Sequence, residues 1–195
     1  MSGWWQPLVF GLAACVAGSA YAQSPPTERR LDERLKQCGA CHGEDGNSRT
    51  ENIPSLAGQP EFFVMNQLFL MREGVRRIEA MAPFVKDLKD DELNGLAKHF
   101  AGLAPKPSGE TIDASLVKRG ATLAVSLRCG SCHLPGLAGQ QQIPRLAKQR
   151  IDYMVYAMKT FRDNQRSGAD TSMSAAVIGI SDADLTALAH FAASR

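Results

Sequence analysis

The pentapeptide Cys38-Gly39-Ala40-Cys41-His42 returns in the same pattern as Cys129-Gly130-Ser131-Cys132-His133. On a helix, residues three and four apart share one face, so two thiols can reach the edge of one flat ligand while the next imidazole points at its centre. Cys-x-x-Cys-His is the attachment signal of c-type haem. The sequence therefore predicts two covalently bound haem c groups, each with two thioether bonds and one histidine on iron.

Two other sites also use Cys-x-x-Cys, namely a redox dithiol and half of a zinc site. Zinc modules usually place a second cysteine pair about 15 to 20 residues after the first. Here the two pairs lie 91 residues apart, and a histidine follows each pair. This arrangement favours haem attachment over both alternatives.

The first 22 residues have the pattern of a secretory signal peptide. They contain no charged side chain, an apolar stretch from residue 8 to 17, and the small-residue ending Ala20-Tyr21-Ala22. Such an ending is typical of a cleavage site, so we expect export to the periplasm. Leu12-Ala13-Ala14-Cys15 also resembles a lipoprotein cleavage box, which would leave Cys15 acylated and the protein tethered to a membrane.

The two haem motifs belong to a longer internal repeat. Residues 53–59 (IPSLAGQ) recur 90 positions later as residues 143–149 (IPRLAKQ), with five of seven residues identical, and residues 91–97 match residues 183–189. Residues 104–109 lie between the halves and contain prolines and a glycine that cannot continue a helix. We therefore expect a signal peptide at 1–22, one domain at 23–105 and a second at 106–195.

Each half contains apolar residues at helical spacing, and no run shows the alternation of a strand. The expected helices of the first domain cover residues 31–41, 61–72 and 91–103. Those of the second cover residues 114–132, 151–161 and 182–193. Ser181 and Asp184 form a capping box at the start of the last helix.

The second axial ligand decides whether a haem carries electrons or binds a substrate. Met81 lies 39 residues after His42. Met173 lies 40 residues after His133, and these two methionines are the only pair related by the repeat. Both stand in segments that we expect to be loops ahead of the final helix, where a thioether can reach the far face of a haem. We expect core packing for the other methionines of the two domains, Met65, Met71, Met154 and Met158.

The repeat also indicates the roles of the two other histidines and of two prolines. His99 and His190 are not equivalent positions, so we expect them on the terminal helices and not on iron. Pro54 and Pro144 follow the haem histidines at similar distances, and their carbonyls can accept a hydrogen bond from the imidazole that binds iron.

The charge is unevenly divided between the halves. Residues 23–105 contain 11 Lys or Arg against 13 Asp or Glu, whereas residues 106–195 contain 11 against 7. Such asymmetry can orient the molecule toward a charged redox partner. Neither half has the clustered basic residues of a nucleic-acid-binding protein.

Taken together, these features make the chain resemble the two-haem cytochrome c4 family of bacterial periplasmic electron carriers, over residues 23–195. The resemblance implies an all-α fold of two tandem class I cytochrome c domains, each wrapped around one haem and related by a pseudo-twofold axis. It implies thioether bonds at Cys38, Cys41, Cys129 and Cys132. It implies axial iron ligands at His42, Met81, His133 and Met173. His99 and Phe191 depart from the family, whose final helices often carry a tyrosine.

Two His/Met-ligated irons leave no coordination position for a substrate, so the expected chemistry is reversible Fe(III)/Fe(II) cycling at a fairly high potential. We expect an electron carrier and not an enzyme, working between a quinol-oxidising complex and a terminal oxidase or reductase. One alternative is an electron-accepting subunit of a dehydrogenase or oxidase complex. Another is a dihaem peroxidase, which needs a displaceable ligand and a distal acid or base that the sequence does not indicate.

Overall fold

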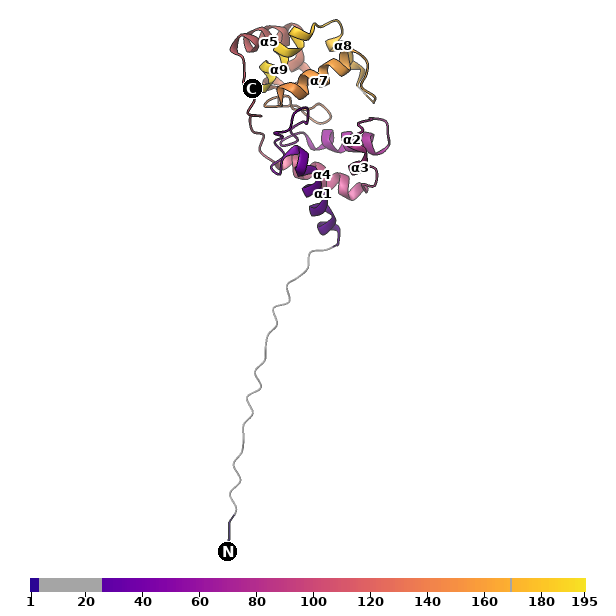
Figure 1. The fold of residues 1–195 in the computed structure, drawn as a ribbon, viewed down its shortest axis with the longest axis vertical. Coiled ribbons are helices and arrows are strands. Elements are labelled where there is room, and N and C mark those ends of the chain that lie inside the picture. The colour runs from indigo at the N-terminus through magenta and orange to yellow at the C-terminus, as the bar shows by residue number, and fades with distance from the viewer. Residues whose placement is uncertain (4–25, 169) are drawn as a thin grey trace.

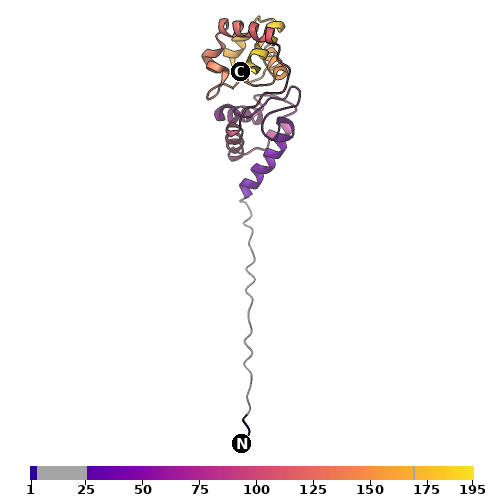
Figure 2. The ribbon, with the colours of Figure 1, turned by 90° about the vertical axis from the view of Figure 1, so that its left-hand side faces the viewer.

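The computed structural model describes residues 1–3, 26–168 and 170–195. The expected signal-peptide cleavage site and Cys15 lie outside these residues. The two halves of the repeat form two helical lobes stacked along the long axis, with the C-terminal lobe at the top of the view and the N-terminal lobe below it (Figures 1 and 2). In the described ranges the only bridge of β type is an isolated one between Gln140 and Ile143.

The first lobe contains α1 (Pro26–His42), α2 (Glu61–Arg72), α3 (Ala82–Val85) and α4 (Asp90–Gly102). The second contains α5 (Ala114–Ser126), α6 (Cys129–His133), the 3-10 helix η1 (Pro135–Leu137), α7 (Ile151–Arg162), α8 (Thr171–Val177) and α9 (Asp182–Ala193). No single helix within 1–3, 26–168 and 170–195 is long and apolar enough to cross a membrane. The pair α8 and α9, bent by 114°, passes that test only together, by length and composition.

The expected helix 114–132 is wrong, because the chain breaks it into α5 and α6. Leu127 ends α5 by donating its backbone N–H to Leu123 O, and Arg128 then takes a left-handed conformation with φ of 57°. A residue of this kind commonly ends a helix and turns the chain. The first haem motif thus completes a long helix, whereas the second occupies a short helix of its own.

The expectation that Met81 and Met173 lie in loops holds for Met81 and is wrong for Met173. Met81 lies in the turn that caps the N-terminus of α3, whereas Met173 lies inside α8. Pro83 lies in the first turn of α3, where proline is tolerated. The side chain of Asp170 accepts a hydrogen bond of 2.7 Å from Ser172 N and caps α8.

Of the capping box expected at α9, the half made by Ser181 is confirmed. Ser181 Oγ accepts a hydrogen bond of 3.1 Å from Asp184 N, which satisfies one of the free N–H groups at the start of the helix. Four of the expected ranges, 61–72, 91–103, 151–161 and 182–193, match observed helices to within one residue at each end, whereas the helix expected at 31–41 begins five residues earlier, at Pro26.

Each lobe is built around a crossing of its first and last long helices, α1 with α4 and α5 with α9. The two crossings are tight at a glycine. A Cβ atom added to Gly95 of α4 would lie 2.9 Å from Leu31 Cδ2, and one added to Gly120 of α5 would lie 2.1 Å from Ala187 O. The second contact is with backbone, which cannot move away as a side chain can.

We expect Gly120→Ala to destabilise the second lobe by about 1–3 kcal/mol, because its methyl group would push α5 away from α9. The measurement is denaturant unfolding of the haem-loaded protein followed by circular dichroism. Gly102→Ala is the matched control, since a Cβ there meets no atom within 4 Å. Equal stability of Gly120→Ala and the unsubstituted protein would contradict the proposed close crossing.

The repeated segments 53–59 and 143–149 meet where the two lobes touch. Gln59 donates from Nε2 to Arg145 O and accepts from Arg145 N, both at 3.0 Å. Gln149 makes the equivalent pair with Ser55, accepting from Ser55 N at 2.8 Å and donating to Ser55 O at 2.9 Å. All four residues are buried. The reciprocal contacts relate the lobes by a pseudo-twofold axis.

The segment between α4 and α5 contains no helix and is held to both lobes. Lys106 donates its backbone N–H to Asn47 Oδ1 at 2.7 Å, and its ammonium lies 2.9 Å from Asp45 Oδ2. Glu110 accepts hydrogen bonds from the backbone N–H groups of Ile151 and Asp152 at 2.8 and 3.1 Å, and so caps α7. This connection restrains the lobes in addition to the glutamine contacts.

Candidate functional site

The first haem motif occupies the last turn of α1. Its cysteines lie on the accessible side, with Cys41 exposed and Cys38 half-buried. His42 points inward, is only 6% exposed, and donates from Nδ1 to Pro54 O at 2.8 Å. The proline carbonyl thus fixes the plane of the imidazole, as we expected from the sequence.

The second motif repeats this arrangement even though its helix is short. Cys132 is exposed and Cys129 is half-buried. His133 is 8% exposed, and its Nδ1 donates to Pro144 O at 2.8 Å. The two imidazoles therefore have the same hydrogen bond in both lobes, despite the break between α5 and α6.

Both imidazoles have the chemical form that a metal ion needs. Burial lowers the pKa of His42 and of His133, and the proline carbonyls only partly oppose this effect. A neutral imidazole that donates from Nδ1 keeps a lone pair on Nε2. Nε2 is therefore the atom available to an iron, and a buried imidazole beside one exposed and one half-buried thiol fits a covalently attached haem. No cluster of three or more His, Cys, Asp or Glu side chains suited to a metal ion occurs in the described ranges.

Met81 and Met173 each pack against the same hydrophobic cluster as one cysteine of their own lobe. Met81 and Cys38 both pack against the core of the first lobe, which contains Val85 and Leu96. Met173 and Cys129 both pack against the cluster of the second lobe that contains Leu185. Each lobe therefore brings its repeated methionine and its haem motif to one apolar core.

The other methionines take the packing roles that we expected. Met154 is 5% exposed in the core of the second lobe, and Met158 packs beside it. Met65 and Met71 are partly buried against the core of the first lobe.

The two remaining histidines lie on the terminal helices, as we expected. The ring of His99 on α4 meets the ring of Phe100 edge-on, with 5.4 Å between ring centroids. His190 on α9 accepts a hydrogen bond of 3.1 Å at Nδ1 from the backbone N–H of Asp113, the residue that caps α5. That contact gives His190 a structural role between α5 and α9.

Sequence reasoning missed an arginine and tyrosine cluster at the lobe boundary. Arg76 of the first lobe is 9% exposed and donates to Gln67 Oε1 at 2.6 Å. Burial alone would raise the pKa of Tyr153, but Arg76 and Arg166 outweigh burial and lower that pKa. Arg76 and Arg166 are related by the same shift of 90 residues as the proline segments. This repeated arginine is the sequence feature from which the cluster could have been predicted.

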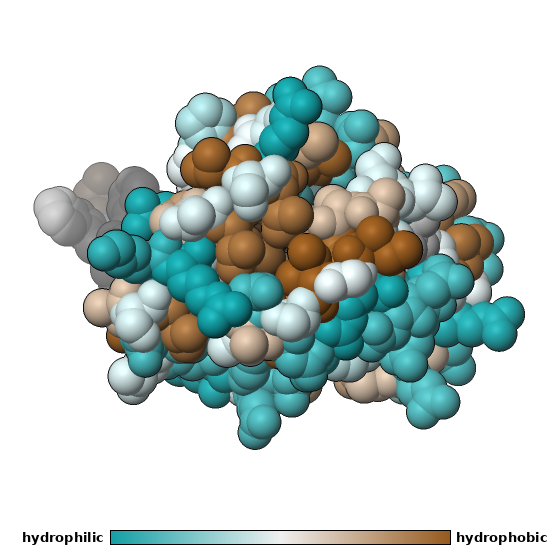
Figure 3. Space-filling model, turned by 90° about the horizontal axis from the view of Figure 1, so that it is seen from above, coloured by the Kyte–Doolittle hydropathy of each residue, from teal (hydrophilic) through white to brown (hydrophobic). Residues whose placement is uncertain are grey.

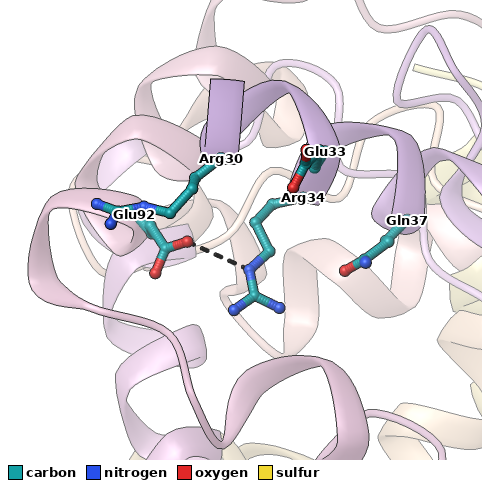
Figure 4. Close-up of a pocket in the computed structure, with 5 residues that line it drawn as sticks. All are labelled: Arg30, Glu33, Arg34, Gln37 and Glu92. Atoms are coloured by element: carbon teal, nitrogen blue, oxygen red, sulfur yellow. Dashed lines mark hydrogen bonds and ion pairs between the residues drawn. The ribbon is translucent and has the colours of Figure 1, made fainter. Parts of the chain in front are cut away.

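A polar depression between α1 and α4 is separate from the haem motifs. It is lined by Arg30, Glu33, Arg34, Gln37 and Glu92 (Figure 4). Arg34 Nε lies 3.3 Å from Glu92 Oε1, and the other oxygen of Glu92 accepts from Lys89 N at 2.9 Å. Glu92 thereby joins the start of α4 to α1, which is a structural role.

Comparison with known proteins agrees with two haem-binding lobes. Residues 32–99 match the family model "Cytochrome C oxidase, cbb3-type, subunit III", and residues 117–194 match the model "Cytochrome c". Cytochrome c4 of Pseudomonas aeruginosa is 32% identical over 165 residues, which cover 79% of this chain and 81% of that protein. The chain belongs to the cytochrome c4 family.

A solved structure of a cytochrome c4 has the same fold as this chain. Reduced recombinant cytochrome c4 from Pseudomonas stutzeri superposes with a TM-score of 0.77 at 27% identity, covering 88% of this chain and 99% of that one. A thiosulfate dehydrogenase electron acceptor of Thiomonas intermedia is 28% identical, over 94% of this chain and 90% of that protein. The cytochrome c4 family therefore includes this chain, and electron transfer is its general function.

Proposed function

We propose that the protein is a periplasmic dihaem electron carrier that takes electrons from a quinol-oxidising complex and passes them to a terminal oxidase or reductase. The single observation that carries this proposal is the equality of the two sites. In both lobes a buried histidine donates to a proline carbonyl at 2.8 Å, and in both a repeated methionine packs on the same core as a motif cysteine. Two equal, closed sites suit electron passage better than peroxide reduction, which needs one open site.

Bound haem supplies one-electron Fe(III)/Fe(II) chemistry, and the residues of this chain set its conditions. Cys38, Cys41, Cys129 and Cys132 would hold the two groups covalently. The Pro54 and Pro144 carbonyls orient the histidines and raise their basicity as ligands. Met81 and Met173 would each supply a thioether to the iron of their own lobe, and a thioether ligand raises the potential. The apolar cores exclude water and disfavour the additional positive charge of Fe(III).

Partner contact is supported by an exposed apolar surface. The end of the molecule formed by the second lobe has apolar side chains gathered near its middle with polar side chains around them (Figure 3). Val125 and Ile178, 79% and 72% exposed, are the most exposed large apolar residues of that lobe. An apolar centre with a polar rim is typical of a docking surface between proteins.

Spectroelectrochemical titration of the haem-loaded protein tests the carrier function. We expect two haems per chain, two one-electron Nernstian steps, and no binding of carbon monoxide to the reduced protein, because both irons would already be six-coordinate. Rapid gas binding by one unsubstituted haem, together with peroxide consumption, would instead support a peroxidase. A haem count of one would reject the dihaem assignment.

An electron-accepting subunit of a dehydrogenase complex is the second candidate. The Thiomonas intermedia relative, named for accepting electrons from thiosulfate dehydrogenase, favours it because the similarity covers nearly the whole of both chains. The haem chemistry is the same and only the partner differs. Copurification of the native protein with a large catalytic subunit at stoichiometric yield would favour this role, and recovery as a free protein would favour the mobile carrier.

A further inference from the structure

Arg145 occupies a position where the two repeats differ. It follows Pro144, and its counterpart in the first repeat is Ser55, which follows Pro54. Ser55 serves its own lobe, because its Oγ accepts a hydrogen bond of 3.0 Å from Ser48 N. Arg145 instead crosses the boundary between the lobes, and its Nη2 donates to Ala57 O at 2.7 Å. Only one of the two equivalent positions therefore holds a cation.

The guanidinium of Arg145 lacks the partners that a buried charge requires. The residue is 5% exposed, and its Nε and Nη1 atoms are buried with no hydrogen-bond partner in the described part of the chain. Arg150, which is buried nearby in the sequence, is instead paired with Asp152 and Glu110. Each unsatisfied buried donor costs about 1–3 kcal/mol, and more when it is charged. An anion at Arg145 would remove this cost.

Arg145 remains a cation under ordinary conditions. Burial lowers its pKa to about 10, which is still well above neutral pH. No carboxylate of residues 26–168 or 170–195 forms an ion pair with it. The missing acceptor is therefore an anion that comes with a bound group.

We propose that Arg145 binds haem propionate at the boundary between the two lobes. The proposal rests on haem attachment as set out under the proposed function. Arg145 directly follows the proline that orients His133, and its guanidinium reaches the backbone of the first lobe, so it lies between the two candidate sites. A propionate carboxylate offers acceptors only, which matches the two free donors.

The positions of the two free donors determine how many carboxylates Arg145 can bind. Nε and Nη1 lie on different edges of the planar guanidinium, so a single carboxylate cannot bind both. Arg145 can therefore hold two carboxylates at once. In that arrangement one side chain joins the haem groups of both lobes, and its charge favours the reduced state of the haem nearest to it. Because Ser55 provides no second charge, the effect on each haem depends on how closely its propionate approaches Arg145.

The test uses the haem-loaded protein with Arg145→Gln, Arg145→Lys and the control Ser55→Ala. We expect Arg145→Gln to shift the Fe(III)/Fe(II) equilibrium of at least one haem about tenfold toward Fe(III), which is 59 mV for one electron. Arg145→Lys retains the charge without the planar fork, so the potential should shift less. Both variants should change the propionate bending bands in resonance Raman spectra, and Ser55→Ala should change neither potential nor bands.

Unchanged potentials and unchanged propionate bands in Arg145→Gln would overturn the proposal. If Arg145→Gln does not fold, the propionate bands of Arg145→Lys decide alone, and unchanged bands again reject it. Haem count and the absence of carbon monoxide binding in the unsubstituted protein test the proposed function separately. A failure confined to the Arg145 variants therefore leaves the carrier function intact.

Discussion

Replacing Met81 by alanine opens the haem of the first lobe to carbon monoxide, and replacing Met173 does the same in the second. Each variant should bind one equivalent of carbon monoxide after reduction, while the other haem stays closed. Loss of the thioether should lower the potential of the altered haem by more than 59 mV, a change of more than tenfold in its redox equilibrium. The measurements are gas titration by visible absorbance and spectroelectrochemistry.

Matched controls for these variants come from the other methionines. Met65→Ala removes a thioether that packs on the same core as Met81, and Met158→Ala does so for Met173. These controls should lose some stability but keep both haems closed. Normal spectra and no gas binding in Met81→Ala or Met173→Ala would show that another side chain occupies the axial position.

Removing the reciprocal glutamine contacts should separate the unfolding of the two lobes. Gln59→Ala leaves Arg145 N and O without their partners, and Gln149→Ala leaves Ser55 N and O without theirs. Unsatisfied buried backbone groups cost about 1–3 kcal/mol each, so each variant should weaken lobe association strongly. Calorimetry of the double variant should show two transitions where the unsubstituted protein shows one.

Gln37→Ala is the control for this experiment, because Gln37 is an exposed glutamine of α1. It should leave the unfolding profile unchanged. A single unshifted transition in the Gln59 and Gln149 double variant would mean that the linker contacts of Lys106 and Glu110 suffice to join the lobes.

The internal repeat predicted most of the fold because it constrained both halves together. Residues 61–72 contain Phe62, Met65, Leu68 and Phe69 at helical spacing, and residues 182–193 follow the Ser181 cap and match residues 91–97, so both helices could be placed closely. The break at Arg128 could not be predicted, because a left-handed arginine has no sequence signature of its own. The short helices at Met81 and Met173 were missed for a related reason, since four- and seven-residue helices are too short to show periodicity.

The candidate sites were predicted better than the contacts between the lobes. The carbonyls of Pro54 and Pro144 could be assigned to the histidines because the repeat placed them at similar separations in both halves. The role of Gln59 and Gln149 could not be read from the sequence, although both belong to the repeated segment. Their side chains bind backbone atoms of the opposite lobe, and backbone atoms leave no trace in residue identity.

Because the two glutamines bind backbone atoms, the residues that they contact can differ between the duplicated halves. Gln59 and Gln149 grip the main chain at Arg145 and Ser55, so neither contact depends on which side chain stands there. One copy can therefore carry an arginine and the other a serine without loosening the assembly. Specialisation of each half could proceed independently of docking, and identical ancestors could become unequal members of one electron path.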